Sequence, residues 1–354
     1  MKKYLAIAFI IALSACCSKN SEPQTEPIPE PEPTPVAEEV FAKGADIGWV
    51  TEMESKGYKF YDADGVETEC TALMKKLGCN AVRHRVWVNP SSDHWCDKSD
   101  LLVKCLRAKA LGMDIMVDFH YSDWWADPGQ QNVPAAWTGH SSDQLAQDVA
   151  GHTKDVLNLL KSNDIDVKWV QVGNEVTNGM LWETCRVKDQ SASSFVKVFN
   201  AGRDAVKEVY KDAVVILHVD NGWNMETLSW YFDLMKKTGA SYDMIGLSLY
   251  PSYWDDAAGA YPDWNDKVSR FLNNISKLHS NYSKPVMLCE FGMPASEPEK
   301  ASAALSKILS STTSYDWFKG VFLWEPESEK SRNGYDYGAF KDGKATSAMD
   351  PFKD

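Results

Sequence analysis

Short apolar segments alternate with longer amphipathic segments from residue 41 to the end of the chain. The short segments have the length and composition of buried strands, whereas the longer ones repeat apolar residues every three or four positions, as helices do. This pattern predicts strands near 43–48, 80–87, 113–119, 167–173, 214–219, 243–249, 285–291 and 319–325. It predicts helices near 66–77, 98–111, 142–163, 191–210, 225–238, 264–281 and 298–313.

Strands that alternate with helices usually form a parallel sheet. Eight such strands, with no glycine-rich phosphate loop after the first, favour a closed (β/α)8 TIM barrel over an open, doubly wound sheet. The sequence shows no internal repeat and no second domain boundary. We therefore expect a single catalytic domain over 41–354, with its chemistry at the carboxyl ends of the strands, where such barrels place their active sites.

The N-terminal segment is a targeting sequence rather than part of the domain. Lys2 and Lys3 precede an apolar stretch, and the segment 13–16 then resembles the lipobox of a bacterial lipoprotein. We expect a lipoprotein signal peptide over 1–16 with lipidation of Cys16; the alternative is ordinary signal cleavage near Ala15. The proline- and glutamate-rich segment 17–40 predicts an extended linker. An exported lipoprotein anchored to the bacterial outer membrane is the expected form; exposure at the cell surface is one of the two sides that the sequence leaves open.

Composition and charge exclude several kinds of ligand. The formal net charge of −13 disfavours nucleic acid, anionic membrane surfaces and polyanionic polysaccharides. A neutral sugar polymer is indifferent to this charge, and the 14 tryptophans offer rings on which sugars stack. The cysteines and histidines show none of the spacings typical of metal sites. We therefore expect no metal and no other cofactor, membrane contact only through the lipid anchor, and a monomer.

Two glutamates end predicted strands three βα units apart. Glu175 follows the fourth strand, directly after Asn174, and Glu290 lies at the end of the seventh. Carboxyl groups on strands 4 and 7 of one barrel face each other across its mouth. Retaining glycoside hydrolysis needs such a pair about 5–5.5 Å apart, one as acid/base and one as nucleophile. The sequence therefore predicts a retaining glycosidase.

Other strand ends carry residues suited to support that pair. Arg83 is expected to point inward from the second strand and to keep a carboxylate ionised, the alternative being a structural salt bridge. The same alternative is favoured for Arg85. Tyr250, after the sixth strand, can donate a hydrogen bond to the carboxylate on strand 7, and Trp324, at the end of the eighth, can form the floor of a sugar site.

Further polar and aromatic residues follow the first, third and fifth strands. They are Asp46, His120, Trp125, Asp220 and Trp223. A lone histidine is more often a satisfied core residue than a ligand. His120, however, leads directly into a polar and aromatic loop, which favours a place in the site.

The chain resembles the arabinogalactan endo-β-1,4-galactanases, glycoside hydrolase family 53, over about 41–350. The resemblance rests on strings of residues at the predicted strand ends: Arg83-His84-Arg85-Val86-Trp87-Val88-Asn89-Pro90, Ser122-Asp123 with Trp125-Ala126-Asp127-Pro128, Gly173-Asn174-Glu175, His218-Val219-Asp220 with Gly222-Trp223, and Trp324-Glu325-Pro326. The chain departs from the usual family pattern at Trp124, at Leu249 and directly after Glu290. It has no match for the calcium-binding loop of some bacterial members.

The resemblance implies endo-hydrolysis of β-1,4-galactosidic bonds in type I (arabino)galactan, with the polysaccharide and galactooligosaccharides as partners. It implies that Glu175 is the acid/base and Glu290 the nucleophile. Asn174 is then placed to hold the sugar 2-hydroxyl, and His120, Asp220 and Trp324 line the site of the cleaved sugar. Two alternatives stay open from the residues alone. One is a related β-1,4-glucan or mannan endo-hydrolase, and the other is a non-catalytic glycan-binding surface lipoprotein.

Overall fold

The computed structural model describes residues 40–90, 93–253 and 263–353. The predicted signal peptide, with Cys16, and nearly all of the predicted linker lie outside the described residues. The compact unit spans Phe41–Asp354. None of the helices within the described ranges has the length and apolar character that crossing a membrane requires.

Eight parallel strands close into a barrel in which each strand pairs with its neighbours in chain order and β8 pairs with β1. This confirms the predicted TIM barrel. The strands are β1 (Ala42–Asp46), β2 (Ala81–Val86), β3 (Asp114–Phe119), β4 (Trp169–Val172), β5 (Val214–Val219), β6 (Met244–Leu249), β7 (Val286–Phe291) and β8 (Phe318–Trp324).

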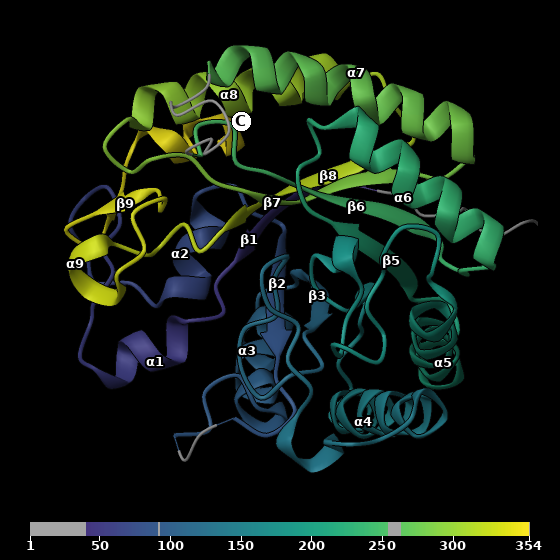
Figure 1. Ribbon diagram of the computed structural model, residues 1–354. Coiled ribbons are helices and arrows are strands. Elements are labelled where there is room, and N and C mark those ends of the chain that lie inside the picture. Colours follow the sequence, from purple (N-terminus) through teal and green to yellow (C-terminus); the bar gives the residue numbers. More distant parts are fainter. Residues whose placement is uncertain (1–39, 91–92, 254–262, 354) are drawn as a thin grey trace, which may run out of the picture. The chain divides into compact units, whose positions relative to one another are not determined.

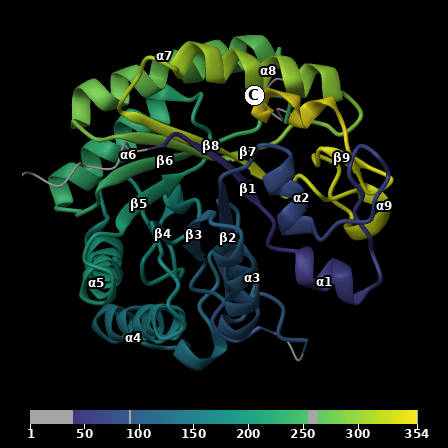
Figure 2. The same ribbon diagram turned by 180° about the vertical axis from the view of Figure 1, so that it is seen from behind.

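Helices surround the barrel, as the two opposite views show (Figures 1 and 2). Seven of them correspond to predicted helices: α2 (Cys70–Lys76), α3 (Lys98–Ala110), α4 (Ser142–Lys161), α5 (Ser193–Val209), α6 (Met225–Thr238), α7 (Trp264–Tyr282) and α8 (Pro298–Thr312). Local sequence fixes several of their starts. Ser141 and Gln144 form a reciprocal capping box at the start of α4, which satisfies backbone N–H groups that the helix itself leaves unpaired.

The hydrophobic core has two parts. A large cluster fills the space between the barrel and its helices, and a smaller one fills the barrel interior. Inside the barrel, the rings of Trp169 and Phe322 pack edge to face, with their centroids 6.0 Å apart. Gly44 makes room for them, because a Cβ atom there would lie 2.1 Å from Phe322 Cδ1. The barrel is therefore packed with side chains below its mouth, as TIM barrels are.

The pattern did not predict the shortest elements. These are α1 (Val50–Ser55), α9 (Lys330–Asn333), the two-stranded pair of β9 (Phe340–Lys341) and β10 (Lys344–Ala345), and the 3-10 turns η1 (Ala135–Trp137), η2 (Val176–Asn178) and η3 (Ser347–Phe352). They are too short to show a period. The β9–β10 turn nevertheless has a recognisable signal, because Asp342 and Gly343 both have positive φ, which Asp-Gly sequences favour in hairpins.

Every cysteine in the described ranges is a buried free thiol. Cys289, on β7, packs inside the barrel.

Candidate active site

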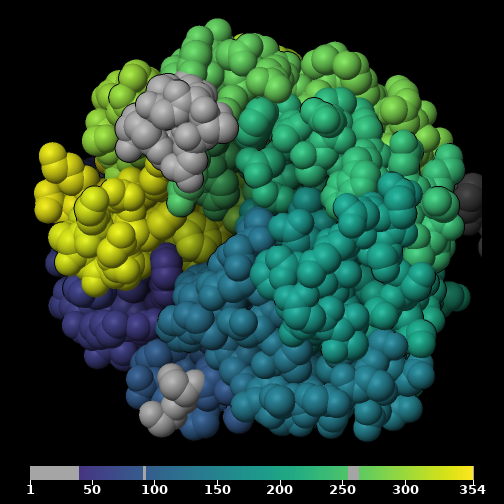
Figure 3. Space-filling model, in the orientation of Figure 1, coloured from purple at the N-terminus to yellow at the C-terminus, as the bar shows by residue number. Residues whose placement is uncertain are grey.

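The barrel register brings the predicted site residues to one end. Asp46 lies beside Arg83 on one side and beside Trp324 on the other. Glu290 pairs in register with Ser248 on β6. The space-filling view shows the segments after β1 and β8, in purple and yellow, beside the blue and teal segments after β2 and β3 (Figure 3). The loops that follow these strands therefore share one mouth.

Glu175 and Glu290 face each other at this mouth. An oxygen from each carboxyl group lies within 4.8 Å of the other and of a ring nitrogen of His218. Glu175 follows β4 with a positive φ of 46°, a conformation that costs free energy in a non-glycine residue and that is common at active sites. The distance between the two carboxyl groups is close to the 5–5.5 Å that retaining glycosidases use.

Arg83 holds Glu290 in a buried ionic network. Its Nη2 atom lies 2.9 Å from Glu290 Oε1 and 2.9 Å from Asp118 Oδ2. Its Nη1 atom pairs with Asp46, and Nε donates to Gln171 Oε1 at 2.7 Å. Arg83 is thus both the predicted partner of the strand 7 carboxylate and part of a structural salt-bridge network. Each oxygen it contacts would lose a charged partner if it were removed.

The second Glu290 oxygen accepts a hydrogen bond from the Tyr250 hydroxyl at 2.8 Å. This is the contact predicted for that tyrosine. Burial raises the pKa of the Tyr250 phenol well above its usual value, and the charge of Glu290 adds to the effect. The phenol therefore keeps its proton and can only donate to the carboxylate.

The two glutamates differ in how their charged forms are stabilised. Burial raises the pKa of Glu290, but the Arg83 charge and the Tyr250 hydrogen bond oppose that rise. Burial also raises the pKa of Glu175, to well above its usual value, and the negative charges of Glu290 and Asp220 raise it further. Glu175 is therefore the group that holds a proton, and Glu290 the one that is ionised first.

Gln171, His218 and Ser248 form a buried polar network beside Glu175. None of the three was among the predicted site residues. Gln171 Nε2 lies 2.7 Å from His218 Nδ1, and His218 Nε2 lies 2.9 Å from Ser248 Oγ. Burial lowers the pKa of His218 well below its usual value, so the ring is neutral. With Nδ1 as acceptor, Nε2–H donates to Ser248, which in turn hydrogen-bonds Glu175. Strand alternation was the available signal, since Gln171 and His218 are interior positions of β4 and β5.

His120 has both ring nitrogens engaged within the protein. Its Nε2 atom donates to Asp118 Oδ2 at 3.0 Å, and Nδ1 accepts from the Ala126 N–H at 3.0 Å. His120 therefore joins the Arg83 network to the loop after β3. The predicted contact with the cleaved sugar stays a prediction.

The Asn174 side chain joins Arg83, which binds Glu290, to the loop after β3. Its Oδ1 atom accepts from Arg83 Nη2 at 2.8 Å, and its Nδ2 atom donates to the Ala126 carbonyl at 2.9 Å. Nδ2 carries two hydrogens. Oδ1 also lies 3.0 Å from His218 Nδ1. The side chain is therefore held on both sides and still has one N–H for a ligand.

Aromatic rings form one side of the mouth. The rings of Trp49, Trp125 and Trp324 contact one another with centroids 5.3–5.8 Å apart. The Arg85 guanidinium lies over Trp125, 4.2 Å from the ring centroid, and pairs with Glu325. The salt bridge expected for Arg85 is therefore present, and the rings of Trp125 and Trp324 lie together at the mouth.

The two predicted residues after β5 lie differently. Asp220 accepts a hydrogen bond from Thr177, and its charge acts on Glu175. The Trp223 ring, in contrast, is covered by Lys267 and Arg270 of α7, whose charged ends lie 4.3 and 4.8 Å from its centroid. Among the described residues, no ring contact joins Trp223 to the Trp49, Trp125 and Trp324 cluster.

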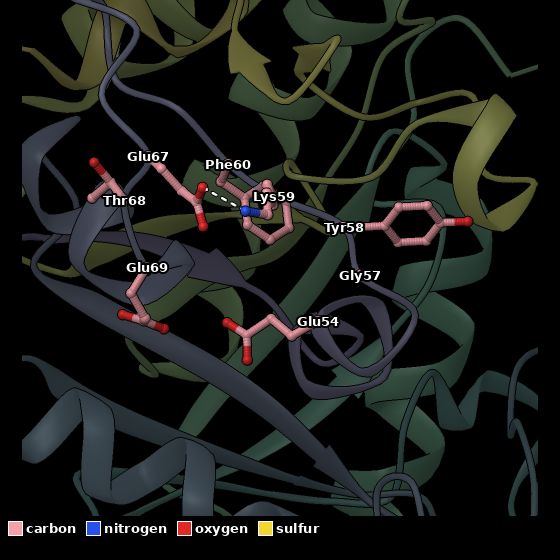
Figure 4. A pocket seen from close by; sticks show the side chains of 8 residues that line it. All are labelled: Glu54, Gly57, Tyr58, Lys59, Phe60, Glu67, Thr68 and Glu69. Carbon is pink, nitrogen blue, oxygen red and sulfur yellow. Dashed lines mark hydrogen bonds and ion pairs between the residues drawn. The ribbon is translucent and has the colours of Figure 1, made fainter.

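A separate hollow of about 380 Å³ lies between α1 and the segment before α2 (Figure 4). None of its lining residues is a predicted site residue: they are Glu54, Gly57, Tyr58, Lys59, Phe60, Glu67, Thr68 and Glu69. Lys59 pairs with Glu67 across it at 2.8 Å. The other two glutamates of the hollow, Glu54 and Glu69, pair with Arg107. We therefore assign this hollow no part in the chemistry at the barrel mouth.

The model of glycosyl hydrolase family 53 matches residues 42–352. The chain belongs to this family. It is 33% identical over 269 residues to a probable arabinogalactan endo-β-1,4-galactanase A of Neosartorya fischeri, covering 74% of this chain and 72% of that one. A similar relative of Aspergillus terreus is 30% identical over 313 residues, covering 82% and 86%.

Solved structures agree with the family assignment. A structure of fungal β-1,4-galactanases has a TM-score of 0.78 and 26% identity, covering 88% of this chain and 98% of the other. The family 53 catalytic domain of Ignisphaera aggregans has a TM-score of 0.75 at 24% identity, over 91% and 98%. The barrel seen here is thus the fold of this family.

Proposed function

We propose that the protein hydrolyses internal β-1,4-galactosidic bonds of type I (arabino)galactan, with retention of anomeric configuration. The observation that carries the proposal is the pair of carboxyl groups within 4.8 Å of each other, in a chain of family 53 whose relatives are named as galactanases. The barrel mouth offers a neutral polymer aromatic surfaces and hydrogen-bonding groups.

Glu290 and Glu175 have separate roles in the two steps. In the first, a Glu290 oxygen attacks the anomeric carbon, the glycosidic bond breaks, and Glu175 gives its proton to the leaving oxygen. In the second, water attacks the same carbon, Glu175 takes a proton from it, and the bond to Glu290 breaks. Two displacements at one carbon return the original configuration. The raised pKa of Glu175 supports its assignment as the acid.

Neighbouring residues prepare the pair for these steps. Arg83 and Tyr250 each bind one oxygen of Glu290, which favours its charged form and fixes the oxygens for attack. The remaining N–H of Asn174 is assigned to the sugar 2-hydroxyl, where hydrogen bonds strengthen in the transition state. Trp324 is assigned to the face of the sugar at the cleavage point.

Product analysis on purified β-1,4-galactan, beside cellulose and β-1,4-mannan, tests the substrate. We expect galactooligosaccharides from galactan, a rapid fall in viscosity before many reducing ends appear, and little product from the other two. Cleavage of glucan or mannan in preference to galactan would overturn the substrate assignment. Absence of hydrolysis on all three would favour the non-catalytic glycan-binding alternative.

We also propose that the protein is a lipoprotein of the bacterial outer membrane that is anchored through Cys16 and exposed at the cell surface. The support is the lipobox-like sequence at 13–16 and the proline- and glutamate-rich composition of the segment that follows it. Fractionation of cells should find the protein in the outer-membrane fraction, and Cys16→Ser should release it in soluble form. Wild-type protein found entirely in the soluble fraction would contradict the anchor.

A further inference from the structure

Trp124, in the loop after β3, has an unusual position for a large apolar side chain. Its exposed fraction is 52%, whereas Trp87, against which it packs, is 3% exposed. The two rings are tilted by 38°, with centroids 4.8 Å apart. One side of the Trp124 ring is therefore supported by a buried ring while much of the ring remains open to solvent. Exposing an indole in this way costs free energy that burial elsewhere would have recovered.

The backbone on both sides of Trp124 is held by hydrogen bonds. The Asp123 carboxylate accepts from the N–H groups of Asn89 at 2.9 Å and Ala135 at 2.8 Å. Two residues beyond Trp124, the Ala126 N–H donates to His120 in the catalytic network. The loop thus fixes the Trp124 ring relative to the catalytic residues. A fixed ring binds a ligand without losing much side-chain entropy on binding.

The exposed ring is continuous with the aromatic surface at the active site. Trp87 contacts Trp125 with centroids 5.3 Å apart, and Trp125 contacts Trp324 at 5.8 Å. Trp124 also contacts Trp125 directly, with centroids 6.4 Å apart. The rings of Trp124, Trp125 and Trp324 therefore form a row that leads to the floor of the proposed cleavage site, with the buried Trp87 behind it. A polymer bound across Glu175 and Glu290 and following that row would reach the exposed ring.

We propose that Trp124 forms an outer subsite, on which a galactosyl residue of the bound galactan chain stacks away from the cleavage point. The inference rests on the proposed function and adds a residue that determines chain-length preference. The C–H face of a galactose ring is apolar and meets an aromatic face without needing any charge. Stacking there holds long chains more tightly and leaves the chemistry at Glu175 and Glu290 unchanged.

The test compares two substrates with Trp124→Ala and Trp124→Phe. The substrates are galactan and the shortest galactooligosaccharide that the wild-type enzyme cleaves. An aromatic contact of about 0.5–1.5 kcal/mol corresponds to a change in KM of about two- to thirteenfold. We expect Trp124→Ala to raise the KM for galactan by that factor with kcat nearly unchanged. Its kinetics on the short substrate should match wild type. Trp124→Phe, which keeps an aromatic ring, should retain most of the wild-type affinity for galactan.

Val103→Ala provides a matched control, because Val103 is an exposed apolar residue of α3 (45% exposed). This variant is expected to have wild-type kcat and KM on both substrates. An equal loss on the short and long substrates would assign Trp124 a structural role and overturn the proposal. So would an unchanged KM for galactan in Trp124→Ala. Failure of the wild-type enzyme to cleave galactan would instead overturn the proposed function, and with it the basis of this subsite.

Discussion

The hydrogen bond from Tyr250 to Glu290 can be removed by deleting a single hydroxyl group. Tyr250→Phe keeps the ring and its packing but leaves Glu290 Oε2 without the donor that now lies 2.8 Å away. The bond stabilises the charged form of Glu290, so its loss raises the pKa of the nucleophile. Hydrolysis needs the ionised nucleophile, and the effect should therefore be largest at low pH.

The size of this effect follows from the bond that is lost. A hydrogen bond to a charged group contributes about 1.5–3 kcal/mol, and we take the lower end because Arg83 continues to bind the other Glu290 oxygen. About 1.4 kcal/mol corresponds to one pKa unit. The acid limb of the kcat/KM profile should therefore move up by about one pH unit, with about a tenfold loss on that limb.

The assay is kcat/KM on galactan across the pH range for wild type, Tyr250→Phe and Tyr253→Phe. Tyr253 is an exposed neighbour whose ring centroid lies 6.3 Å from that of Tyr250, and its variant should match wild type. An acid limb that stays in place in Tyr250→Phe, or a loss of equal size at every pH, would refute the reasoning about the charge of Glu290.

Three further outcomes are expected. Glu175→Gln should reduce hydrolysis of galactan by at least about a hundredfold, as expected for the loss of a general acid. Hydrolysis of an aryl galactoside whose leaving group needs no proton should fall much less, and equal losses on both substrates would contradict the acid role. A chelator should leave turnover unchanged at a temperature where the fold survives, and loss of turnover with an intact fold would show a metal requirement. Although burial alone would raise the pKa of Asp118, Arg83 and His120 bring it below its usual value. Its contribution to stability is therefore complete above about pH 3.9 and is lost as the pH falls through the folded pKa, so Asp118→Asn should flatten the fall in Tm at acid pH; an unchanged slope would contradict this.

The barrel was predictable because each strand and helix carries its own local pattern. All eight strands and seven helices lie where the alternation placed them. Glu175 and Glu290 could be found for the same reason, since a residue that ends a barrel strand lies at the mouth whatever the loops do. The Arg83 and Tyr250 contacts with Glu290 followed from that placement.

The remaining contacts of the site could not be predicted, because they depend on strand register and on packing between distant segments. That Arg83 also meets Asp118 and Gln171 depends on how β2, β3 and β4 are staggered, which no single segment encodes. Trp223 was included among the candidate site residues only because it follows a strand end. Its ring instead packs under cations from α7, a helix that lies later in the chain. Such a contact depends on helix packing rather than on the strand that precedes the residue.

The assignment of the two glutamates is tested most directly by azide rescue. The substrate is an aryl β-galactobioside with a good leaving group, and the variants are Glu290→Ala and Glu175→Ala. With the nucleophile removed, azide occupies the space that Glu290 left and attacks the anomeric carbon from that side. With the acid/base removed, the galactosyl-enzyme still forms, and azide attacks it from the opposite side.

The account predicts an α-glycosyl azide from Glu290→Ala and a β-glycosyl azide from Glu175→Ala, each identified by the anomeric proton coupling in the NMR spectrum. The reverse pair of products would exchange the two roles. Hydrolysis by Glu290→Ala at the wild-type rate without azide would contradict the double-displacement mechanism itself.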